Sequence, residues 1–161
     1  MTYLCYRLEQ LNESGPVLLK AAVLENVPGK HVEIRFRDSG SIQNLENYNQ
    51  YQVTWYISWS PCAECAQEVS TFLREHPNVH LSIFTSRLYF WNEPDKQQGL
   101  RDLQKAGVHI KIMSSQDFED CWETFVDHQG ERFQPWEGIE ANMDFFAGRL
   151  ADILECEKED N

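Results

Sequence analysis

Four side chains in two short stretches of the chain have the types and spacing of a metal site. Cys62 directly follows Pro61, and Cys65 comes three residues later, at the expected start of a helix. The first turn of a helix brings side chains i and i+3 to one face. His31 would supply a third ligand, and zinc with three protein ligands keeps a fourth position for water, as catalytic zinc does. Glu33 lies two residues after His31, so it can take a proton from that water and pass it to a leaving group.

Each of the two motifs is weak evidence when it is taken alone. A single C-x-x-C also occurs as a redox pair or without any function, and H-x-E is common by chance. The metal site is favoured because both motifs occur in one order, with a strand-length segment between them and a proline before the first cysteine. H-x-E followed by P-C-x-x-C is the signature of zinc nucleobase deaminases. The remaining cysteines, Cys5, Cys121 and Cys156, are expected to be ordinary thiols.

Strands and helices alternate along the chain after an opening hairpin. Apolar periodicity and turn residues predict strands at 2–10, 17–26, 51–58, 78–86 and 108–113. They predict helices at 61–76 and 95–106, a third helix capped by Ser114, and a fourth from after Pro135 to about Glu155. This order indicates an α/β sandwich around a mixed sheet. Trp55, Trp122 and Trp136 are expected in the core.

The segment 31–45 is ambiguous by pattern. Val32, Ile34 and Phe36 alternate with polar residues, which is typical of a strand. The metal chemistry requires instead that His31 stand at the beginning of a helix. Both alternatives stay open at this point.

Composition limits the class of protein. The chain has 161 residues, 42% of them apolar, which suits one globular domain over 1–161 with an acidic tail at 155–161. The formal net charge of −12 argues against a surface that binds polyanions everywhere, so contact with a nucleic acid must be local. There is no apolar run of membrane-spanning length and no signal-peptide pattern. We therefore expect an intracellular, cytoplasmic or nuclear protein that makes no contact with a membrane and is a monomer.

Several segments are similar in sequence to one protein family. They are TYLCY at 2–6, HVE at 31–33, YQVTWYISWSPCAEC at 51–65, PNVHLSIFTSRLYF at 77–90, GLRDLQKAGVHIKIM at 99–113, DCWETFVDHQGERFQPWEGI at 120–139 and GRLADIL at 148–154. In these segments the chain resembles the AID/APOBEC family of polynucleotide cytidine deaminases. HVE and Leu88-Tyr89-Phe90 resemble activation-induced deaminase, whereas SWSPC and FQPW resemble the third APOBEC subgroup. The residues therefore name the family and not the member.

The resemblance implies a fold, a cofactor and a reaction. The fold is a cytidine-deaminase-like α/β arrangement, with a five-stranded mixed sheet flanked by helices. One zinc ion would be held by His31, Cys62 and Cys65, with Glu33 as general acid and base. The reaction would be hydrolytic deamination of cytosine to uracil in single-stranded DNA, or in RNA, on a base extruded into a pocket.

The resemblance also implies which residues meet the substrate. Pocket walls would come from Asn26, Trp59, Ser60 and Tyr89, where aromatic faces stack on bases and Asn26 can bind sugar or phosphate. Phe90, Trp91 and Asn92 would lie in the loop that reads the base 5′ of the target. Arg87 would either pair with a phosphate or only end its strand.

Three features depart from the family pattern. The chain starts at Met1-Thr2, so we expect the N-terminal helix and the basic loop after it to be missing. Polar residues at 37–40 replace apolar ones, so the helix bearing Glu33 is expected to be short. The third departure is the acidic charge, which leaves few cations near the site and predicts weak, salt-sensitive binding over a few nucleotides. These cations are Lys30, Arg35, Arg87 and Lys96.

Two other functions are compatible with these residues. A catalytically weak or inactive module could keep zinc for folding and bind nucleic acid or a protein. A deaminase of free cytidine would need only the zinc core, although the aromatic residues at 89–91 favour a polynucleotide strand.

Overall fold

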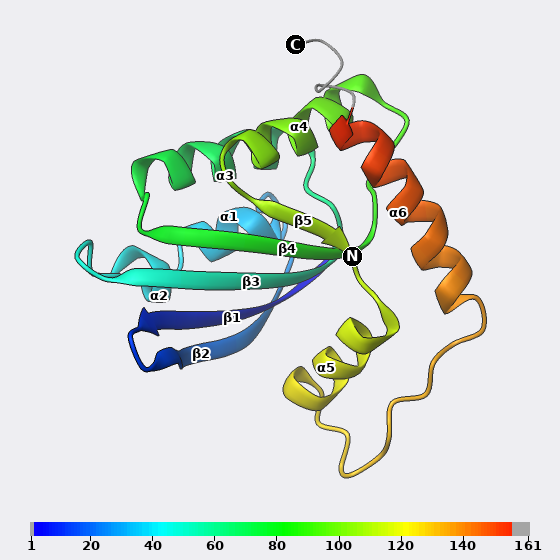
Figure 1. Ribbon diagram of the computed structural model, residues 1–161, viewed down its shortest axis with the longest axis horizontal. Helices are drawn as coiled ribbons and strands as arrows, with labels where there is room; N and C mark the ends of the chain where they lie inside the picture. Colours follow the sequence, from blue (N-terminus) through cyan, green and yellow to red (C-terminus); the bar gives the residue numbers. More distant parts are fainter. Residues whose placement is uncertain (1, 156–161) are drawn as a thin grey trace.

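A mixed sheet forms the centre of the molecule in the computed structural model, which describes residues 2–155. These residues form five strands in the order β2-β1-β3-β4-β5 (Figure 1). β1 (Tyr3–Asn12) is antiparallel to β2 (Gly15–Glu25) and to β3 (Gln50–Trp59). β3, β4 (Val79–Arg87) and β5 (His109–Ile112) run parallel to one another. The parallel strands therefore end at one edge of the sheet, where the loops that follow them meet.

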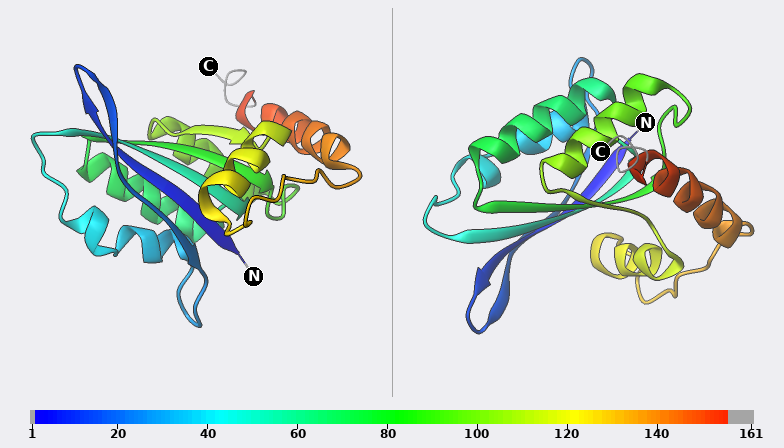
Figure 2. Two further views of the ribbon diagram at one scale, coloured as in Figure 1. Left: turned by 90° about the horizontal axis from the view of Figure 1, so that it is seen from below. Right: turned by 45° about the horizontal axis from the view of Figure 1, so that its top comes forward.

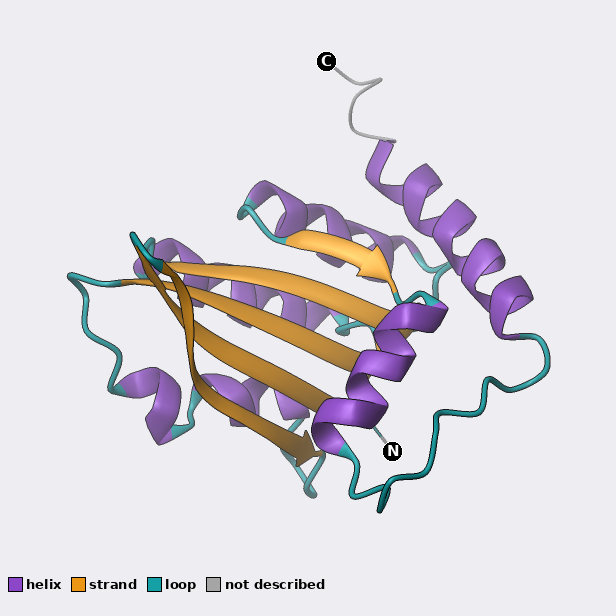
Figure 3. Cartoon of the chain, turned by 60° about the horizontal axis from the view of Figure 1, so that its bottom comes forward, coloured by secondary structure: helices purple, strands orange, loops and turns teal. Residues whose placement is uncertain are grey.

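Helices cover the two faces of the sheet unequally. One face carries α1 (Val32–Arg37), α2 (Gly40–Gln43), α3 (Ala63–Glu75) and α4 (Pro94–Lys105). α5 (Ser115–Phe125) crosses one end of the opposite face, as Figure 3 shows, and the right view of Figure 2 separates these layers. α6 (Ile139–Glu155) contacts α4, β5 and β4. Among the described residues, no helix is both long and apolar enough to cross a bilayer.

The core lies between the sheet and α1, α3 and α4. Alternate residues of the strands point toward these helices, because successive side chains in a strand face opposite sides. Trp55, Ile57 and Ile83 are each at most 1% exposed, and Phe36 of α1 packs edge-on against Trp55. This packing holds α1 and α3, which carry the candidate metal ligands, against the ends of the strands.

Most predicted elements are confirmed with shifts of a few residues at their ends. Ser114 caps α5 as predicted, because its side chain accepts a hydrogen bond from the Asp117 N–H at 3.2 Å. The strand alternative for 31–45 is wrong, since residues 32–37 form α1. Val32 and Phe36 are buried on one face of this helix. Residues four apart share a face in a strand as well as in a helix, so the pattern alone fitted both. α1 is six residues long, as the polar stretch after it predicts.

Of the three tryptophans expected in the core, only Trp55 is buried. Trp55 is buried as expected, but Trp136 is 45% exposed and packs edge-on against Phe118, so its core assignment was wrong. It lies in the irregular segment between α5 and α6, which provides no second layer to cover it. Trp122 is half-buried and donates its indole N–H to the Glu131 carbonyl. The acidic tail and Cys156 lie outside the described residues, apart from Glu155, which ends α6.

Candidate active site

The beginning of α1 is positioned by an asparagine from the end of the opening hairpin. Asn26 Oδ1 accepts a hydrogen bond from the Val32 N–H at 3.1 Å, which satisfies one of the free amides at the start of the helix. A short turn, closed by two backbone hydrogen bonds between Val27 and Lys30, leads into His31. His31 is the N-cap residue of α1. Its imidazole is therefore held at the helix end that faces α3.

The two cysteines stand at the beginning of α3, directly after β3. Cys62 is the N-cap residue, and Cys65 lies in the first turn and is buried. The Ala66 N–H donates to the Cys62 carbonyl at 2.9 Å, which closes that turn. Because side chains i and i+3 share a helix face, both sulfur atoms point toward α1. The arrangement predicted from the sequence spacing is thus present.

Three donor atoms converge between α1 and α3. His31 Nδ1 lies 3.2 Å from Cys65 Sγ and 3.7 Å from Cys62 Sγ, and all three donors lie within 4.8 Å of one another. Ligands of a tetrahedral zinc ion are separated by about 3.5 Å for nitrogen and sulfur at ordinary bond lengths. One imidazole and two thiols also match the chemistry of zinc ligands. Both the donor types and their distances therefore fit zinc.

Glu33 is a buried carboxylic acid beside these donors. Only 4% of its surface is exposed, and burial raises the pKa of the carboxyl above its usual value, because the charged form loses hydration. The adjacent Cys65 thiol and His31 lower this pKa by a smaller amount. A carboxyl with a raised pKa holds a proton closer to neutral pH, which suits transfer in both directions. Glu33 has the position and the environment of a general acid and base.

Burial also affects the thiol of Cys65. It raises the pKa of that thiol far above its usual value, and the nearby Glu33 carboxylate adds to the effect. Thiols bind metal as thiolates, so metal binding at this site would release the proton.

An open cleft of about 420 Å³ lies in front of the metal ligands. Trp59 and Tyr89 both line it and contact each other edge-on, with ring centroids 6.5 Å apart. The cleft has the aromatic walls and polar floor that a single flat base requires. Its lining consists of Thr2, Asn26, His31, Glu33, Trp59, Ser60, Cys62 and Tyr89.

Predicted site residues divide into two groups. The structure brings Asn26, Trp59, Ser60 and Tyr89 together with Glu33 around the cleft. The other four predicted residues, Arg87, Phe90, Trp91 and Asn92, do not line it. The Arg87 guanidinium lies over the Trp59 ring, 5.3 Å from its centroid. Phe90 is 52% exposed beside Tyr89, and Trp91 packs against the core.

One residue of the cleft was missed by sequence reasoning. Thr2 lines the cleft, and its carbonyl accepts a hydrogen bond from the Asn26 N–H at 3.3 Å. The pairing of Tyr3 with Glu25 in the hairpin places residue 2 opposite residue 26. An irregularity between Leu8 and Glu9 shifts the hairpin register by one residue, so counting outward from the turn would have placed Thr2 opposite Glu25. The sequence therefore offers no usable signal for Thr2.

Comparisons with known proteins agree with this geometry. A family model for the APOBEC3 cytosine deaminase domain matches residues 1–154, and the chain belongs to this family. The chain is 40% identical over 164 residues to the DNA dC->dU-editing enzyme APOBEC-3G of Lagothrix lagotricha. That alignment covers 96% of this chain and 43% of the relative. The chain therefore spans less than half the length of that protein.

Proposed function

We propose that this chain deaminates cytosine to uracil in single-stranded DNA, by hydrolysis that depends on zinc. The observation that carries the proposal is the buried Glu33 carboxyl beside three donors that lie within 4.8 Å of one another. Membership of the cytosine deaminase domain family and the DNA-editing relative support it. The reaction consumes one water and releases ammonia.

His31, Cys62 and Cys65 would hold the zinc ion. When bound, zinc lowers the pKa of a coordinated water so that it can attack a carbon atom at neutral pH. Glu33 accepts one proton of the attacking water and delivers it to N3 of cytosine. It then takes the second proton, from the hydroxyl now bonded to C4, and gives it to the amino group, which departs as ammonia. The burial of Glu33 favours this role, because a carboxyl with a raised pKa keeps its proton at a higher pH than an exposed carboxyl does, so it can donate as well as accept.

The target base would enter the cleft beside Trp59 and Tyr89. These rings present edges and faces to a planar base, and Ser60 and Asn26 add polar groups to the lining. RNA as a substrate is an outcome that the experiment below also tests.

Charge near the cleft supports contacts with only a few nucleotides. Lys30 pairs with Asp38 at 2.8 Å, and Lys96 pairs with Asp95 at 2.9 Å. Arg87 makes no ion pair with any residue in the described range 2–155, and it lies beside the cleft residue Trp59. We assign to Arg87 a contact with a backbone phosphate of the substrate strand.

A uracil-release assay tests the proposal directly. The substrate is a short single-stranded DNA with one cytosine, at low salt, with the matching RNA and free cytidine in parallel. The wild-type chain is compared with Glu33→Ala, both with one zinc per chain verified. Product is expected from the wild type with DNA, and a loss of at least about 100-fold from Glu33→Ala, since proton transfer contributes that much.

The control is Glu75→Ala, which removes an exposed glutamate at the end of α3, away from the cleft. It should retain wild-type activity, and all three proteins should melt at similar temperatures. If the zinc-loaded wild type forms no uracil in DNA, the proposal is overturned. The second candidate is then favoured, which is a non-catalytic module that binds nucleic acid. Its net charge of −12 would make that binding weak. Faster turnover of RNA or of cytidine would reassign the substrate.

A further inference from the structure

The loop from Leu88 to Glu93, here called the aromatic loop, joins β4 to α4 and is held at both ends. At its beginning, the Tyr89 N–H donates to Ser60 Oγ at 2.7 Å. At its end, the Trp91 carbonyl accepts from Gln97 Nε2 at 2.9 Å. Tyr89 lines the cleft, whereas Trp91 packs against the core on the side of α6. Consecutive aromatic side chains of this loop thus contact different parts of the molecule.

The backbone of the aromatic loop changes direction at Phe90. Its backbone has φ of 43°, in the left-handed region that residues with a side chain rarely adopt. Such a conformation is costly and persists only where the surrounding contacts hold it. The Glu93 N–H donates to the Phe90 carbonyl at 2.9 Å, but this local bond does not fix where the turn lies relative to the cleft. Lys96 Nζ lies 6.0 Å from the centroid of the Phe90 ring, but Lys96 belongs to α4 at the end of the same loop. Contacts of Tyr89 with the cleft and of Trp91 with α6 are those that tie the turn to other parts of the molecule.

Arg149 of α6 provides the contact on the Trp91 side. Its guanidinium carbon lies 5.0 Å from the centroid of the Trp91 ring and 5.1 Å from that of Phe145. The two rings meet edge-on at 5.8 Å. The cation therefore contacts one ring from the aromatic loop and one from α6. The Asp152 carboxylate lies 3.9 Å from the guanidinium, at the outer limit for an ion pair, so this carboxylate competes only weakly with the rings.

α6, which carries Arg149, is itself held against β4 and the core. Asn142 Nδ2 donates to the Ser86 carbonyl at 3.2 Å, near the end of β4. Leu150 and Ile153 are buried in the core, each 5% exposed. In Figure 1, α6 lies beside the segment that leads from β4 into α4. A ring held on α6 is thereby held relative to the strands that carry the cleft.

We propose that Arg149 is a positioning residue, which holds Trp91 on α6 and so fixes the turn at Phe90. This turn presents Tyr89 to the base in the cleft and exposes Phe90 beside it. A nucleotide next to the target in the strand would meet Phe90. Arg149 therefore influences which flanking bases the enzyme accepts, without touching them itself. The part of the inference that concerns flanking bases rests on the proposed function.

Arg149→Gln and Arg149→Lys separate the contributions of shape and charge. Gln removes the cation and the planar guanidinium stack, whereas Lys keeps the charge without the planar group. Only the contact with Trp91 joins the loop to α6, because Phe145 lies on α6 with Arg149. An exposed cation–π contact corresponds to roughly a two- to fivefold population ratio, so its loss should loosen the loop by about two- to fivefold. Lys should restore part of this loss. Arg132→Gln, an exposed arginine between α5 and α6, is the control for charge.

The first measurement needs no substrate. Hydrogen exchange of the aromatic-loop amides, followed by mass spectrometry, should be about two- to fivefold faster in Arg149→Gln than in the wild type. It should be intermediate in Arg149→Lys and unchanged in Arg132→Gln. The melting temperature should shift by only about 2 °C or less, because Arg149 is partly exposed. Unchanged exchange in Arg149→Gln would overturn the proposal.

The second measurement is the preference for flanking bases. Competing single-stranded oligonucleotides that differ only beside the cytosine should be deaminated with a ratio of best to worst that falls by about twofold or more in Arg149→Gln. An unaltered ratio, together with faster exchange, would overturn the role in specificity. If the wild type deaminates none of them, the proposed function fails, and the exchange result still decides whether Arg149 holds the loop.

Discussion

Ser60 Oγ accepts a hydrogen bond from the backbone N–H of Tyr89 at 2.7 Å and thereby ties the segment that leads into the metal-binding helix to the aromatic loop. The Ser60 N–H in turn donates to the Arg87 carbonyl at 2.9 Å. Ser60 is 5% exposed, so these bonds are shielded from water. One serine side chain thus couples the position of the metal ligands to that of the cleft wall formed by Tyr89.

Ser60→Ala should weaken both stability and catalysis. A buried N–H left without its acceptor costs about 1–3 kcal/mol in the free energy of unfolding. The loosened loop should also reduce kcat/KM for a single-stranded oligonucleotide by about tenfold, because Tyr89 is no longer held at the cleft. The measurements are denaturant unfolding and steady-state deamination.

Ser86→Ala is the matched control for this effect. Ser86 Oγ donates to the Ser58 carbonyl at 2.7 Å, on the neighbouring strand and outside the cleft lining. This variant should lose a similar amount of stability while keeping its kcat/KM. Equal losses of activity in the two variants would contradict the coupling through Ser60.

Arg87→Gln should reduce the salt dependence of strand binding. Each phosphate contact contributes about 0.7 to the slope of log affinity against log salt for single strands. Removing the contact assigned to Arg87 should lower that slope by about 0.7 and weaken binding roughly equally for all sequences. Fluorescence anisotropy with a labelled oligonucleotide, on protein that also carries Glu33→Ala, measures this without turnover. Lys111→Gln, which alters an exposed residue of β5, should leave the slope unchanged.

Zinc should protect two cysteines from alkylation and leave two others to respond to pH. Cys62 and Cys65 should resist iodoacetamide in the zinc-loaded protein, because their thiolates would be bound to the metal. Cys62 should react once a chelator has removed the ion, and the melting temperature should fall at the same time. Mass spectrometry of the digested protein identifies each modified residue. Alkylation of Cys62 at equal rates with and without zinc would contradict the ligand assignment.

Cys5 and Cys121 provide the internal reference in that experiment. Burial raises the pKa of Cys5 to about 11 and that of Cys121 further. At pH 8 only about one Cys5 thiol in a thousand is then ionised, and this fraction rises tenfold for each unit of pH. Their alkylation should therefore be slow at pH 8, increase toward pH 10, and not depend on zinc.

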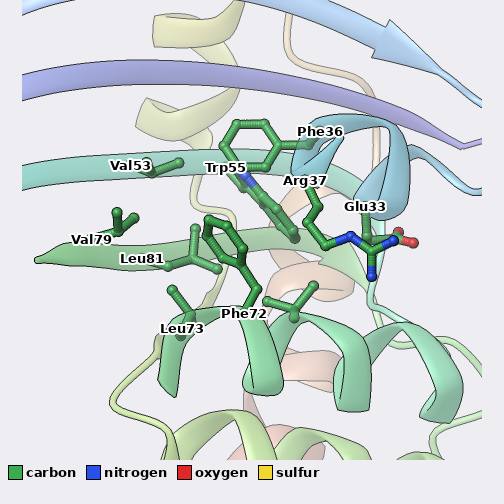
Figure 4. Close-up of a pocket in the computed structure, with 10 residues that line it drawn as sticks. Glu33, Phe36, Arg37, Val53, Trp55, Phe72, Leu73, Val79 and Leu81 are labelled. Carbon is green, nitrogen blue, oxygen red and sulfur yellow. The ribbon is translucent and has the colours of Figure 1, made fainter. Parts of the chain in front are cut away.

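Trp55→Phe should cost less stability than the size of the side chain indicates. Trp55 is 1% exposed, and its indole N–H finds no hydrogen-bond partner within residues 2–155. Figure 4 shows it between Phe36 and Phe72, around a small apolar void beneath α1 and α3. Phenylalanine loses packing but also removes the unpaired donor, and the two effects partly offset each other. We expect a loss of about 1–2 kcal/mol, against about 3–5 kcal/mol for Trp55→Ala.

Denaturant unfolding of the two Trp55 variants beside Trp122→Phe measures this effect. The Trp122 indole N–H donates to the Glu131 carbonyl at 2.8 Å, so that variant loses a satisfied hydrogen bond. A loss for Trp55→Phe close to that of Trp55→Ala would show that packing alone determines the cost.

The sequence by itself determined the chemistry and much of the frame. Residue type and a spacing of three predict that the thiols of Cys62 and Cys65 share one helix face, because helical geometry is local and depends on little else. Alternation predicted β1, β3 and β4, since one buried face requires it. The capping box at Ser114 is equally local. The order of the two motifs, together with the resemblance to the family, then connected the cysteines to His31 and Glu33.

Tertiary structure decided what local pattern left open. Val32 and Phe36 satisfy both a strand and a helix, and only their packing against the sheet selects α1. Thr2 reaches the cleft through the register of a hairpin, and Trp91 turns away from it because α6 offers Arg149. Such outcomes depend on contacts between residues far apart in the chain. Their free energies exist only once the sheet and its helices have assembled.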